Sequence, residues 1–395
     1  MKSRFMKILA LSMSAVALFS FTACGNDTGP ESSTRPGEST GAVTVLDPSD
    51  PTNPSQVPDG STGETPSQAG GGGGQQQGGT AGGGSNNTGG GSNTGGGSNT
   101  GGGNNTGGGS NTGSGSNTGS GNTGGSTPTF DNTHLRIASY NTAAPWGSFW
   151  QGTASSTRVN LFAEELKDLA PDSMGVQEIN SDWVEKLAES APDYAYYGVK
   201  RGGDKNEKES EMSGIFYLKD KYSLIESDTF WISETPDVMS KYPGAGCNRV
   251  CSYVVLKNKQ TGFTYAHLNT HLDNVSTAAQ NLGGELIAQK AQELARKYGG
   301  NLTTVITGDF NQYVNGAACT VLLETGYKSA SDVNPNAANM PTYHGWGEYT
   351  SGRPIDFIFY GGALKAQSFT IHNQKTGSSY TSDHWCISAN FLIQG

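Results

Sequence analysis

The feature that most limits how this chain can fold is a long stretch of glycine, serine, asparagine and threonine. Residues 70–126 repeat units such as GGGSNT, and no charged residue occurs between Glu64 and Asp131. Such a segment has almost no apolar surface to bury, and no repeat unit carries a hydrophobic face, so a flexible coil is expected rather than a repeat fold. We therefore predict a disordered tether over residues 24–129 and a folded domain over residues 130–395.

The N-terminus has the pattern of an export signal. Three basic residues occur in the first seven, an apolar stretch follows over 8–21, and small residues stand directly before Cys24. The apolar run is too short for a membrane-spanning helix. The segment resembles a bacterial lipoprotein signal, although Phe21 stands where leucine is usual. This resemblance implies removal of residues 1–23 and lipid attachment to Cys24, which anchors an exported domain to the membrane at the cell surface. An ordinary signal peptide with an incidental Cys24 is the alternative.

The charge of the chain argues against one class of function. The formal net charge is −10, and residues 130–395 hold 21 basic and 28 acidic side chains, a net charge of −7. Non-specific binding of nucleic acid depends on a basic surface. The composition therefore disfavours a bulk DNA-binding protein. It leaves open a nuclease with a local basic groove or with metal ions that screen its site.

Four cysteines lie in the expected domain, without the paired CxxC spacing of a structural zinc site. Export permits disulfides, and Cys247 and Cys251 are close enough in sequence to pair. For Cys319 and Cys386, a role as small buried apolar side chains is the alternative.

Hydrophobic periodicity predicts a mixture of strands and helices from residue 130 onward. Helices are expected over 158–169, 183–187 and 278–298. Strands are expected over 135–140, 173–178, 194–199, 212–218, 249–256, 264–268, 302–307, 354–359 and 386–392. Strands and helices alternate irregularly and hairpins occur, which favours a two-sheet α/β sandwich over a doubly wound parallel sheet.

Five groups of polar residues each follow or end an expected strand, and strand ends are where α/β proteins assemble their sites. The groups are 139–142 (SYNT), 175–179 (GVQEI), 268–273 (LNTHLD), 306–311 (ITGDFN) and 382–384 (SDH), the last preceded by 353–357 (RPIDF). Taken singly, Asn141 reads as a turn residue and His271 as a structural histidine.

Several of these residues suit phosphoester chemistry. Glu178 closes an apolar strand and offers the oxygen ligand that Mg²⁺ prefers. Asp309 and Asn311 project to the same side, where an aspartate can take a proton from water and an asparagine can donate to a phosphoryl oxygen. Asp383 and His384 suggest a metal ligand beside a proton-transfer group, with Asp356 orienting the imidazole.

The order of these groups over residues 133–393 resembles the endonuclease/exonuclease/phosphatase superfamily. That DNase I-like group includes pancreatic-type DNases, abasic-site endonucleases, bacterial sphingomyelinases and inositol polyphosphate phosphatases. The matching motifs are SYNT, QEI, NTHLD, TGDFN, IDFIF and SDHW. A subgroup of secreted bacterial members also has segments like 230–236 and 269–276, and its substrates are generally unassigned. The resemblance implies a four-layer α/β/β/α sandwich of two mixed, largely antiparallel sheets.

The resemblance also implies roles for individual residues. It makes His271, Asp309, Asn311, Asp356 and His384 catalytic, Asn141 and Arg249 phosphate-binding, Glu211 the residue that holds His271, and Glu178 and Asp383 the ligands of Mg²⁺, or of Mn²⁺ or Ca²⁺. Arg201 is a weaker candidate for the phosphate. The subgroup usually has histidine where this chain has Asn274, so we assign that position no catalytic role.

The expected function is hydrolysis of phosphoester bonds by a monomeric enzyme, with a phosphodiesterase or nuclease favoured. The substrate is a nucleic acid, a phospholipid headgroup or a small phosphate ester. A basic cluster that includes Lys205 and Lys208 would suit a nuclease, and the PWGSFW segment over 145–150 would suit a lipase. Tyr343 and Trp346 would line the pocket of a small-molecule phosphatase. The alternatives are an inactive ligand-binding module on a stalk and a purely structural surface protein.

Overall fold

The computed structural model describes residues 130–145, 154–204 and 210–395. The predicted signal peptide, Cys24, the tether, the aromatic residues of 146–150 and the basic residues Lys205 and Lys208 lie outside the described residues. Among the described residues, none of the helices is both long and apolar enough to cross a membrane.

Two six-stranded sheets form the centre of the domain. The first sheet has the strand order β11-β12-β1-β2-β4-β3, with β11 (Leu364–Ile371), β12 (Ile387–Ile393), β1 (His134–Asn141), β2 (Ser173–Ile179), β4 (Met212–Leu218) and β3 (Tyr194–Tyr197). The second has the order β5-β6-β7-β8-β10-β9, with β5 (Tyr222–Trp231), β6 (Val250–Asn258), β7 (Thr264–His271), β8 (Thr303–Asp309), β10 (Asp356–Gly361) and β9 (Lys328–Ser329).

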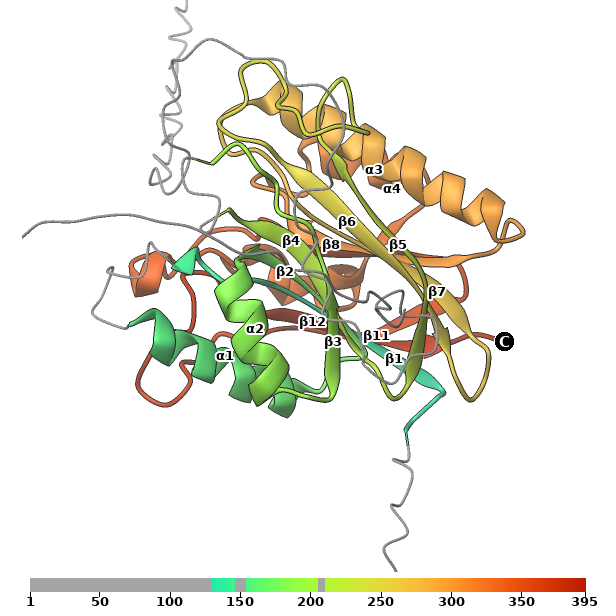
Figure 1. The fold of residues 1–395 in the computed structure, drawn as a ribbon, viewed down its shortest axis with the longest axis horizontal. Coiled ribbons are helices and arrows are strands. Elements are labelled where there is room, and N and C mark those ends of the chain that lie inside the picture. The colour runs from blue at the N-terminus through green and yellow to red at the C-terminus, as the bar shows by residue number, and fades with distance from the viewer. Residues whose placement is uncertain (1–129, 146–153, 205–209) are drawn as a thin grey trace, which may run out of the picture. The chain divides into compact units, whose positions relative to one another are not determined.

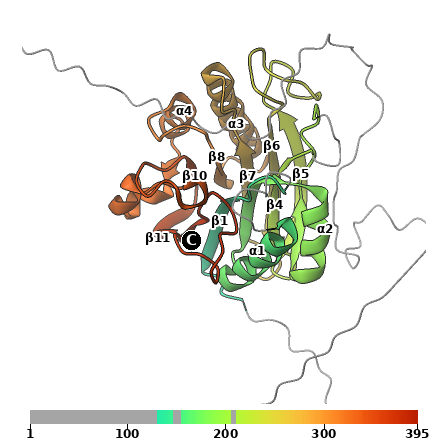
Figure 2. The same ribbon diagram turned by 90° about the vertical axis from the view of Figure 1, so that its left-hand side faces the viewer.

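Helices cover the outer face of each sheet, as Figures 1 and 2 show. They are α1 (Ser155–Leu169), α2 (Ser181–Ser190), α3 (Thr277–Lys297) and α4 (Ala317–Glu324), with short 3₁₀ helices at Ala330–Val333, Pro335–Asn339 and Gly345–Gly347. The side chain of Asn180 accepts a hydrogen bond from the amide of Trp183 at the start of α2, and Ser276 does the same for Ala279 in α3. These caps fix where the two helices begin.

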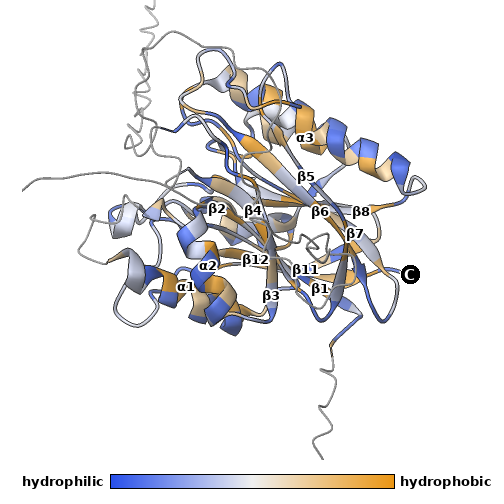
Figure 3. Cartoon of the chain, viewed as in Figure 1, coloured by the Kyte–Doolittle hydropathy of each residue, from blue (hydrophilic) through white to orange (hydrophobic). Residues whose placement is uncertain are grey.

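Three apolar layers hold the sandwich together. One lies between the two sheets and contains residues such as Ile137, Ile215 and Val254. A second packs α1 and α2 on the first sheet through Phe162 and Trp183, and a third packs α3 and α4 on the second sheet. Hydrophobic and hydrophilic residues alternate along α3 in Figure 3, and buried residues such as Ile287, Ala291 and Leu294 belong to the third layer. The predicted α/β/β/α sandwich of two mixed sheets is therefore confirmed.

The strand register brings the predicted polar groups to one end of the sandwich. In the first sheet β1 and β2 are parallel, so Asn141 and Gln177 are paired next to Glu178. In the second sheet the parallel pair β7 and β8 sets His271 opposite Asp309, and antiparallel β10 sets Asp356 opposite Asp309. The sheets lie very close near this end, because a Cβ added at Gly175 would overlap the side chains of Thr307 and Asn269.

The four cysteines of the described residues form no disulfide with one another. Cys251, Cys319 and Cys386 are buried, and Cys247 is partly buried. The suggested Cys247–Cys251 pair is therefore not formed, and Cys319 and Cys386 act as small apolar side chains in the core.

Candidate active site

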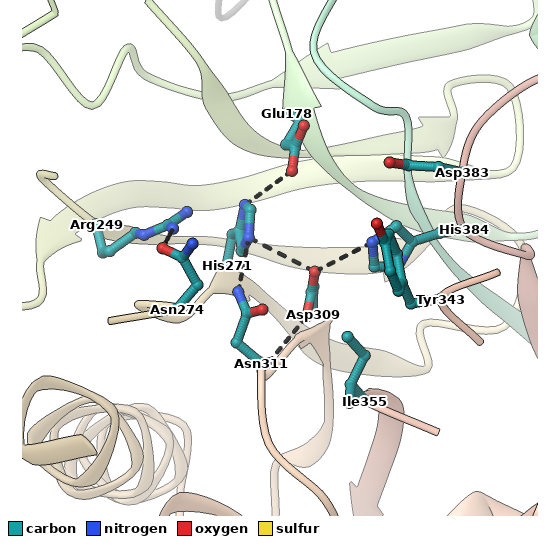
Figure 4. Close-up of a pocket in the computed structure, with 10 residues that line it drawn as sticks. All are labelled: Glu178, Arg249, His271, Asn274, Asp309, Asn311, Tyr343, Ile355, Asp383 and His384. Atoms are coloured by element: carbon teal, nitrogen blue, oxygen red, sulfur yellow. Dashed lines mark hydrogen bonds and ion pairs between the residues drawn. The ribbon is translucent and has the colours of Figure 1, made fainter. Parts of the chain in front are cut away.

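A polar pocket lies where the strand ends of the two sheets meet (Figure 4). Its lining is Glu178, Arg249, His271, Asn274, Asp309, Asn311, Tyr343, Ile355, Asp383 and His384. Seven of these were predicted from the sequence as site residues. Asn141 and Asp356 lie directly behind the lining and hydrogen-bond to it. Glu211 does not line the pocket.

Asp309 lies at the centre of the pocket. Its Oδ2 atom accepts a hydrogen bond from the side-chain amide of Asn141 at 3.0 Å, and its Oδ1 accepts from the backbone amide of Asn311 at 2.9 Å. The same Oδ2 is 3.5 Å from Nε2 of His271 and 3.6 Å from Nε2 of His384. Burial and the neighbouring Asp356 carboxylate raise the pKa of Asp309 to about 7. A fixed carboxylate with a pKa in this range is suited to accept a proton at neutral pH.

His384 is held from behind by Asp356. Its Nδ1 lies 2.9 Å from Oδ2 of Asp356, while Nε2 faces Asp309 in the pocket. Burial disfavours the charged imidazole, but the carboxylates of Asp356 and Asp309 outweigh burial and raise the pKa of His384 to about 10. The ring is therefore a cation at neutral pH and presents an N–H donor to the pocket. The prediction that Asp356 orients His384 agrees with this geometry.

His271 is oriented by Asn311. The side-chain amide of Asn311 lies 3.0 Å from Nε2 of His271 and donates to the carbonyl of Leu272 at 2.9 Å. Burial, together with the positive charge of Arg249, lowers the pKa of His271 well below its ordinary value, so the ring is neutral. Because the asparagine donates to Nε2, the proton of the ring is on Nδ1. That atom is buried without a hydrogen-bond partner among the described residues, 4.0 Å from Oε1 of Glu178.

One sequence-based assignment needs correction here. Glu211 was predicted to hold His271, but its carboxylate instead accepts a hydrogen bond from Arg201 at 2.6 Å in a buried ion pair. Asn311 lines the pocket with its amide nitrogen beside His271, and its predicted contact with the phosphoryl group stays a prediction. The role expected of Glu211 therefore falls to Asn311. Arg201 is bound to Glu211 and Asp204 and does not line the pocket.

The opposite wall of the pocket is acidic. Glu178 ends β2, and its two carboxylate oxygens accept from the side chain of Asn141 at 3.1 Å and from the backbone amide of Ala144 at 2.7 Å. Asp383 lies nearby on the segment before β12 (Figure 4). Burial raises the pKa of Asp383 to about 6, and the like charge of Glu178 adds to this increase. Two neighbouring carboxylates offer the oxygen ligands that hard divalent cations prefer.

The donor set fits a divalent metal ion between Glu178 and Asp383. The mutual repulsion of these two carboxylates falls when a cation binds between them. A second set, Asp309, Asp356 and His384, also has ligand atoms within 4.8 Å of one another. In that set Nδ1 of His384 is occupied by Asp356, so we interpret it as a hydrogen-bonded proton-transfer chain.

Arg249 supplies positive charge to one side of the pocket. Its guanidinium donates to Oδ1 of Asn274 at 3.1 Å and lies 3.6 Å from Asp273. Asn274, which stands where the subgroup has histidine, therefore lines the pocket and supports Arg249. An arginine in this place can bind a phosphoryl oxygen in a fixed geometry.

The backbone is strained at two of these residues. Glu178 and Asn311 have φ values of 58° and 50°, in the left-handed region that residues other than glycine seldom adopt. Strain of this kind is held by the surrounding structure and concentrates at functional sites. It turns both side chains at their strand ends into the pocket.

A buried acid–histidine chain, an acidic wall and a pocket arginine, all at the end of a two-sheet sandwich, define a phosphoester hydrolase. The endonuclease/exonuclease/phosphatase family model matches residues 138–384, and the chain belongs to this family. Its members are typically dependent on divalent metals. No curated protein matches the chain.

Solved structures of bacterial proteins share the fold. The chain is similar to a family protein from Bacteroides thetaiotaomicron at 27% identity, with a TM-score of 0.59 and coverage of 66% of this chain and 96% of that one. It is similar to a family protein from Bacteroides vulgatus at 29% identity, with a TM-score of 0.58 and coverage of 66% and 100%. It is also similar to a mannosyl-6-phosphatase from B. thetaiotaomicron VPI-5482 at 27% identity, with a TM-score of 0.58 and coverage of 66% and 100%.

Proposed function

We propose that this protein hydrolyses small phosphate monoesters with a divalent metal ion, Mg²⁺ being the first candidate and Mn²⁺ and Ca²⁺ the alternatives. The observation that carries the proposal is the division of one pocket into two walls. Glu178 and Asp383 form the acidic wall, and Asp309 faces it between two histidines.

The chemistry of the proposal follows from the charges on these groups. A phosphate ester is anionic, so attack by water requires that negative charge be neutralised on the transferring group. A bound divalent ion supplies part of that neutralisation. Arg249 and the His384 cation supply hydrogen bonds to phosphoryl oxygens, and Nδ1–H of neutral His271 adds another donor. Asp309 accepts the proton of the attacking water, and Asn141 and Asn311 hold its carboxylate in place.

The surroundings of the pocket favour a small substrate. Tyr343 lines the pocket with its ring 5.1 Å from that of His384, and the ring of Tyr349 follows at 5.6 Å. Aromatic faces of this kind pack on the apolar faces of sugar rings and on other flat groups. The net charge of −7 over residues 130–395 disfavours a polyanionic substrate. The mannosyl-6-phosphatase of similar fold supports a sugar phosphate. For these reasons the proposal departs from the phosphodiesterase or nuclease favoured by the sequence.

The test is a comparison of two substrate types under defined metal conditions. The purified protein would be assayed with mannose 6-phosphate, 4-nitrophenyl phosphate and bis(4-nitrophenyl) phosphate in Mg²⁺, Mn²⁺, Ca²⁺ or EDTA. We expect metal-dependent release of phosphate from the monoesters, unchanged in D168N, a control that alters an exposed carboxylate on α1. Faster turnover of the diester would replace the proposal by a phosphodiesterase. Absence of turnover with every metal would favour a stalked binding module.

We further propose that the domain is exported and tethered to the membrane through lipid on Cys24, acting as a monomer at the cell surface. The apolar stretch ending in small residues before Cys24, and the long glycine-rich segment after it, support this. Labelling of expressing bacteria with radioactive palmitate should mark the wild-type chain and not C24S. Equal labelling, or none in either, would contradict lipid anchoring.

A further inference from the structure

Arg158 is a fully buried arginine on the first turns of α1, outside the pocket. Its guanidinium donates to four backbone carbonyls, those of Thr142 at 2.6 Å, Ala143 at 2.7 Å, Thr381 at 2.9 Å and Ala144 at 3.4 Å. Among the described residues, it makes no hydrogen bond or ion pair to a carboxylate. A buried cation bound to backbone oxygens alone is unusual, because buried charges are normally paired.

The first segment that Arg158 holds leads directly to Glu178. Residues 142–144 follow Asn141 at the end of β1, and Ala143 has a φ of 54°. The amide of Ala143 donates to Oδ1 of Asn141, and the amide of Ala144 donates to Oε2 of Glu178. Arg158 therefore fixes the carbonyls of a turn whose amides fix Asn141 and Glu178.

The second segment leads to Asp383. The carbonyl of Thr381 accepts from Arg158, and its hydroxyl donates to Glu165 at 2.5 Å. Arg158 and Glu165 are seven residues apart on α1, which places them on one face of the helix. Next in the chain, the hydroxyl of Ser382 donates to the carbonyl of Asn141 at 2.6 Å. Helix α1 thus holds the segment before Asp383 at both its backbone and its side chain.

Two aromatic rings lie near the guanidinium of Arg158. The ring of Trp183 lies 5.0 Å away and that of Trp346 lies 5.3 Å away. Trp346 itself has a φ of 60°, a strained conformation that sets its ring near the arginine. Burial lowers the pKa of Arg158 to about 10, so it stays charged at neutral pH, and its charge interacts with those of Asp383 and Glu178.

We infer that Arg158 is a positioning residue for the metal centre. It fixes the separation of the Glu178 and Asp383 carboxylates by joining the two segments that carry their supports, without touching metal or substrate. Its charge also offsets the repulsion between the two carboxylates. This inference rests on the proposed metal site at Glu178 and Asp383. A purely structural role, in which Arg158 only anchors α1, predicts lower stability with unchanged metal affinity.

The experiment measures binding of Mn²⁺ alone by calorimetry and by its paramagnetic resonance signal. R158K keeps the positive charge, but the lysine ammonium lacks the planar guanidinium that donates to four carbonyls. Loss of an outer partner of a metal ligand weakens metal binding by about 10- to 100-fold, and we expect this range for R158K. The matched control is R136K, because Arg136 also donates to a backbone carbonyl, that of Leu169 on α1, but lies far along β1 from the pocket.

The outcomes support the inference, overturn it, or overturn the metal site on which it rests. Weaker Mn²⁺ binding in R158K with R136K unchanged supports the inference. Wild-type affinity in a folded R158K, or equal weakening in R136K, overturns it. If near-ultraviolet circular dichroism shows that R158K is not folded, T381V replaces it, because it loosens the segment before Asp383 by removing the hydroxyl bond to Glu165. A smaller weakening in T381V supports the inference, and unchanged affinity overturns it. No Mn²⁺ binding by the wild type, with E178Q as reference, would overturn the proposed metal site itself.

Discussion

The two sheets contribute different chemistry to the same pocket. The ends of β1 and β2 and the segment before β12 provide Asn141, Glu178 and Asp383, which are oxygen ligands and their support. The ends of β7 and β8 and the start of β10 provide His271, Asp309 and Asp356, which are groups that hold or move protons. His384 follows the first sheet's Asp383 but is held by the second sheet's Asp356.

This difference suggests that charge neutralisation and proton transfer are built on separate walls. The side-chain amide of Asn141 donates to both Glu178 and Asp309, so the walls touch but carry different groups. Variants of the acidic wall should respond to metal concentration, whereas variants of the Asp309 wall should not. Two variants test this separation, and a third tests the contact between the two sheets.

Among the variants considered, replacement of Asp309, the proposed proton acceptor, should lower kcat the most. We expect D309N to lower kcat by about 10²- to 10⁴-fold, because a positioned general base contributes a factor of this size. Affinity for Mn²⁺ should stay near that of the wild type. Steady-state kinetics over a range of metal concentrations would measure both. Recovery of D309N activity in excess metal would instead make Asp309 a metal ligand, as its cluster with Asp356 and His384 allows. That result would contradict the assignment of metal binding and proton transfer to different walls.

Replacement of Glu178 in the acidic wall should raise the metal concentration that activity requires. E178Q loses a carboxylate that accepts from Asn141 and Ala144, and the metal requirement should rise beyond the roughly 10- to 100-fold cost of losing an outer partner. Part of the activity should return at high Mn²⁺. The metal concentration for half-maximal activity is the measurement. An unchanged metal requirement with lower kcat would place Glu178 among the proton-transfer groups.

The smallest effect concerns the contact between the sheets. His267 lies fully buried there, with Nδ1 2.8 Å from Ser173 of the first sheet and Nε2 2.8 Å from Thr307 of the second. Burial lowers its pKa from 6.5 to about 3. The unfolded chain therefore binds a proton below about pH 6.5 that the folded chain rejects down to about pH 3. The free energy of unfolding should fall with acidity in that window by up to about 1.4 kcal/mol per pH unit.

The variant H267Q removes this titration, so its stability should fall less steeply than that of the wild type between pH 6.5 and 4. Urea unfolding followed by fluorescence at several pH values would show the difference. The control is H134Q, which alters a partly exposed histidine on β1. Parallel pH profiles for wild type and H267Q would show that the link between the sheets does not depend on a neutral His267.

The central strands were predictable because burial on both faces leaves an apolar run in the sequence. The strands β5 and β11 were not predicted, and each lies at an edge of its sheet. The sequence of β5, YSLIESDTFW, mixes polar and apolar residues without a clear period of two, and in β11, LKAQSFTI, a bulge between Ala366 and Ser368 interrupts the alternation. An edge strand has one exposed side and needs less apolar surface, so its local signal is weak. The eight-residue helix α4 is too short for helical periodicity to separate it from a loop.

The site was predictable where chemistry resides in the side chain itself. Glu178, His271, Asp309, Asp383 and His384 lie at strand ends, and the structure gathers them in one pocket. Apart from Asp356, which was predicted to orient His384, the roles that depend on a partner were not predictable. Glu211 is bound by Arg201, and Arg158 binds backbone carbonyls, which leave no mark in a sequence. An arginine among the buried positions of an amphipathic helix was the one available signal.

Each sheet contains one parallel pair among otherwise antiparallel strands, and a helix joins the two members of each pair. β1, α1 and β2 form one such unit, and β7, α3 and β8 form the other. The two units therefore have the same strand–helix–strand arrangement, and each brings its strand ends to the pocket. A fragment that holds only one of the two units would carry part of these groups and could not complete the pocket.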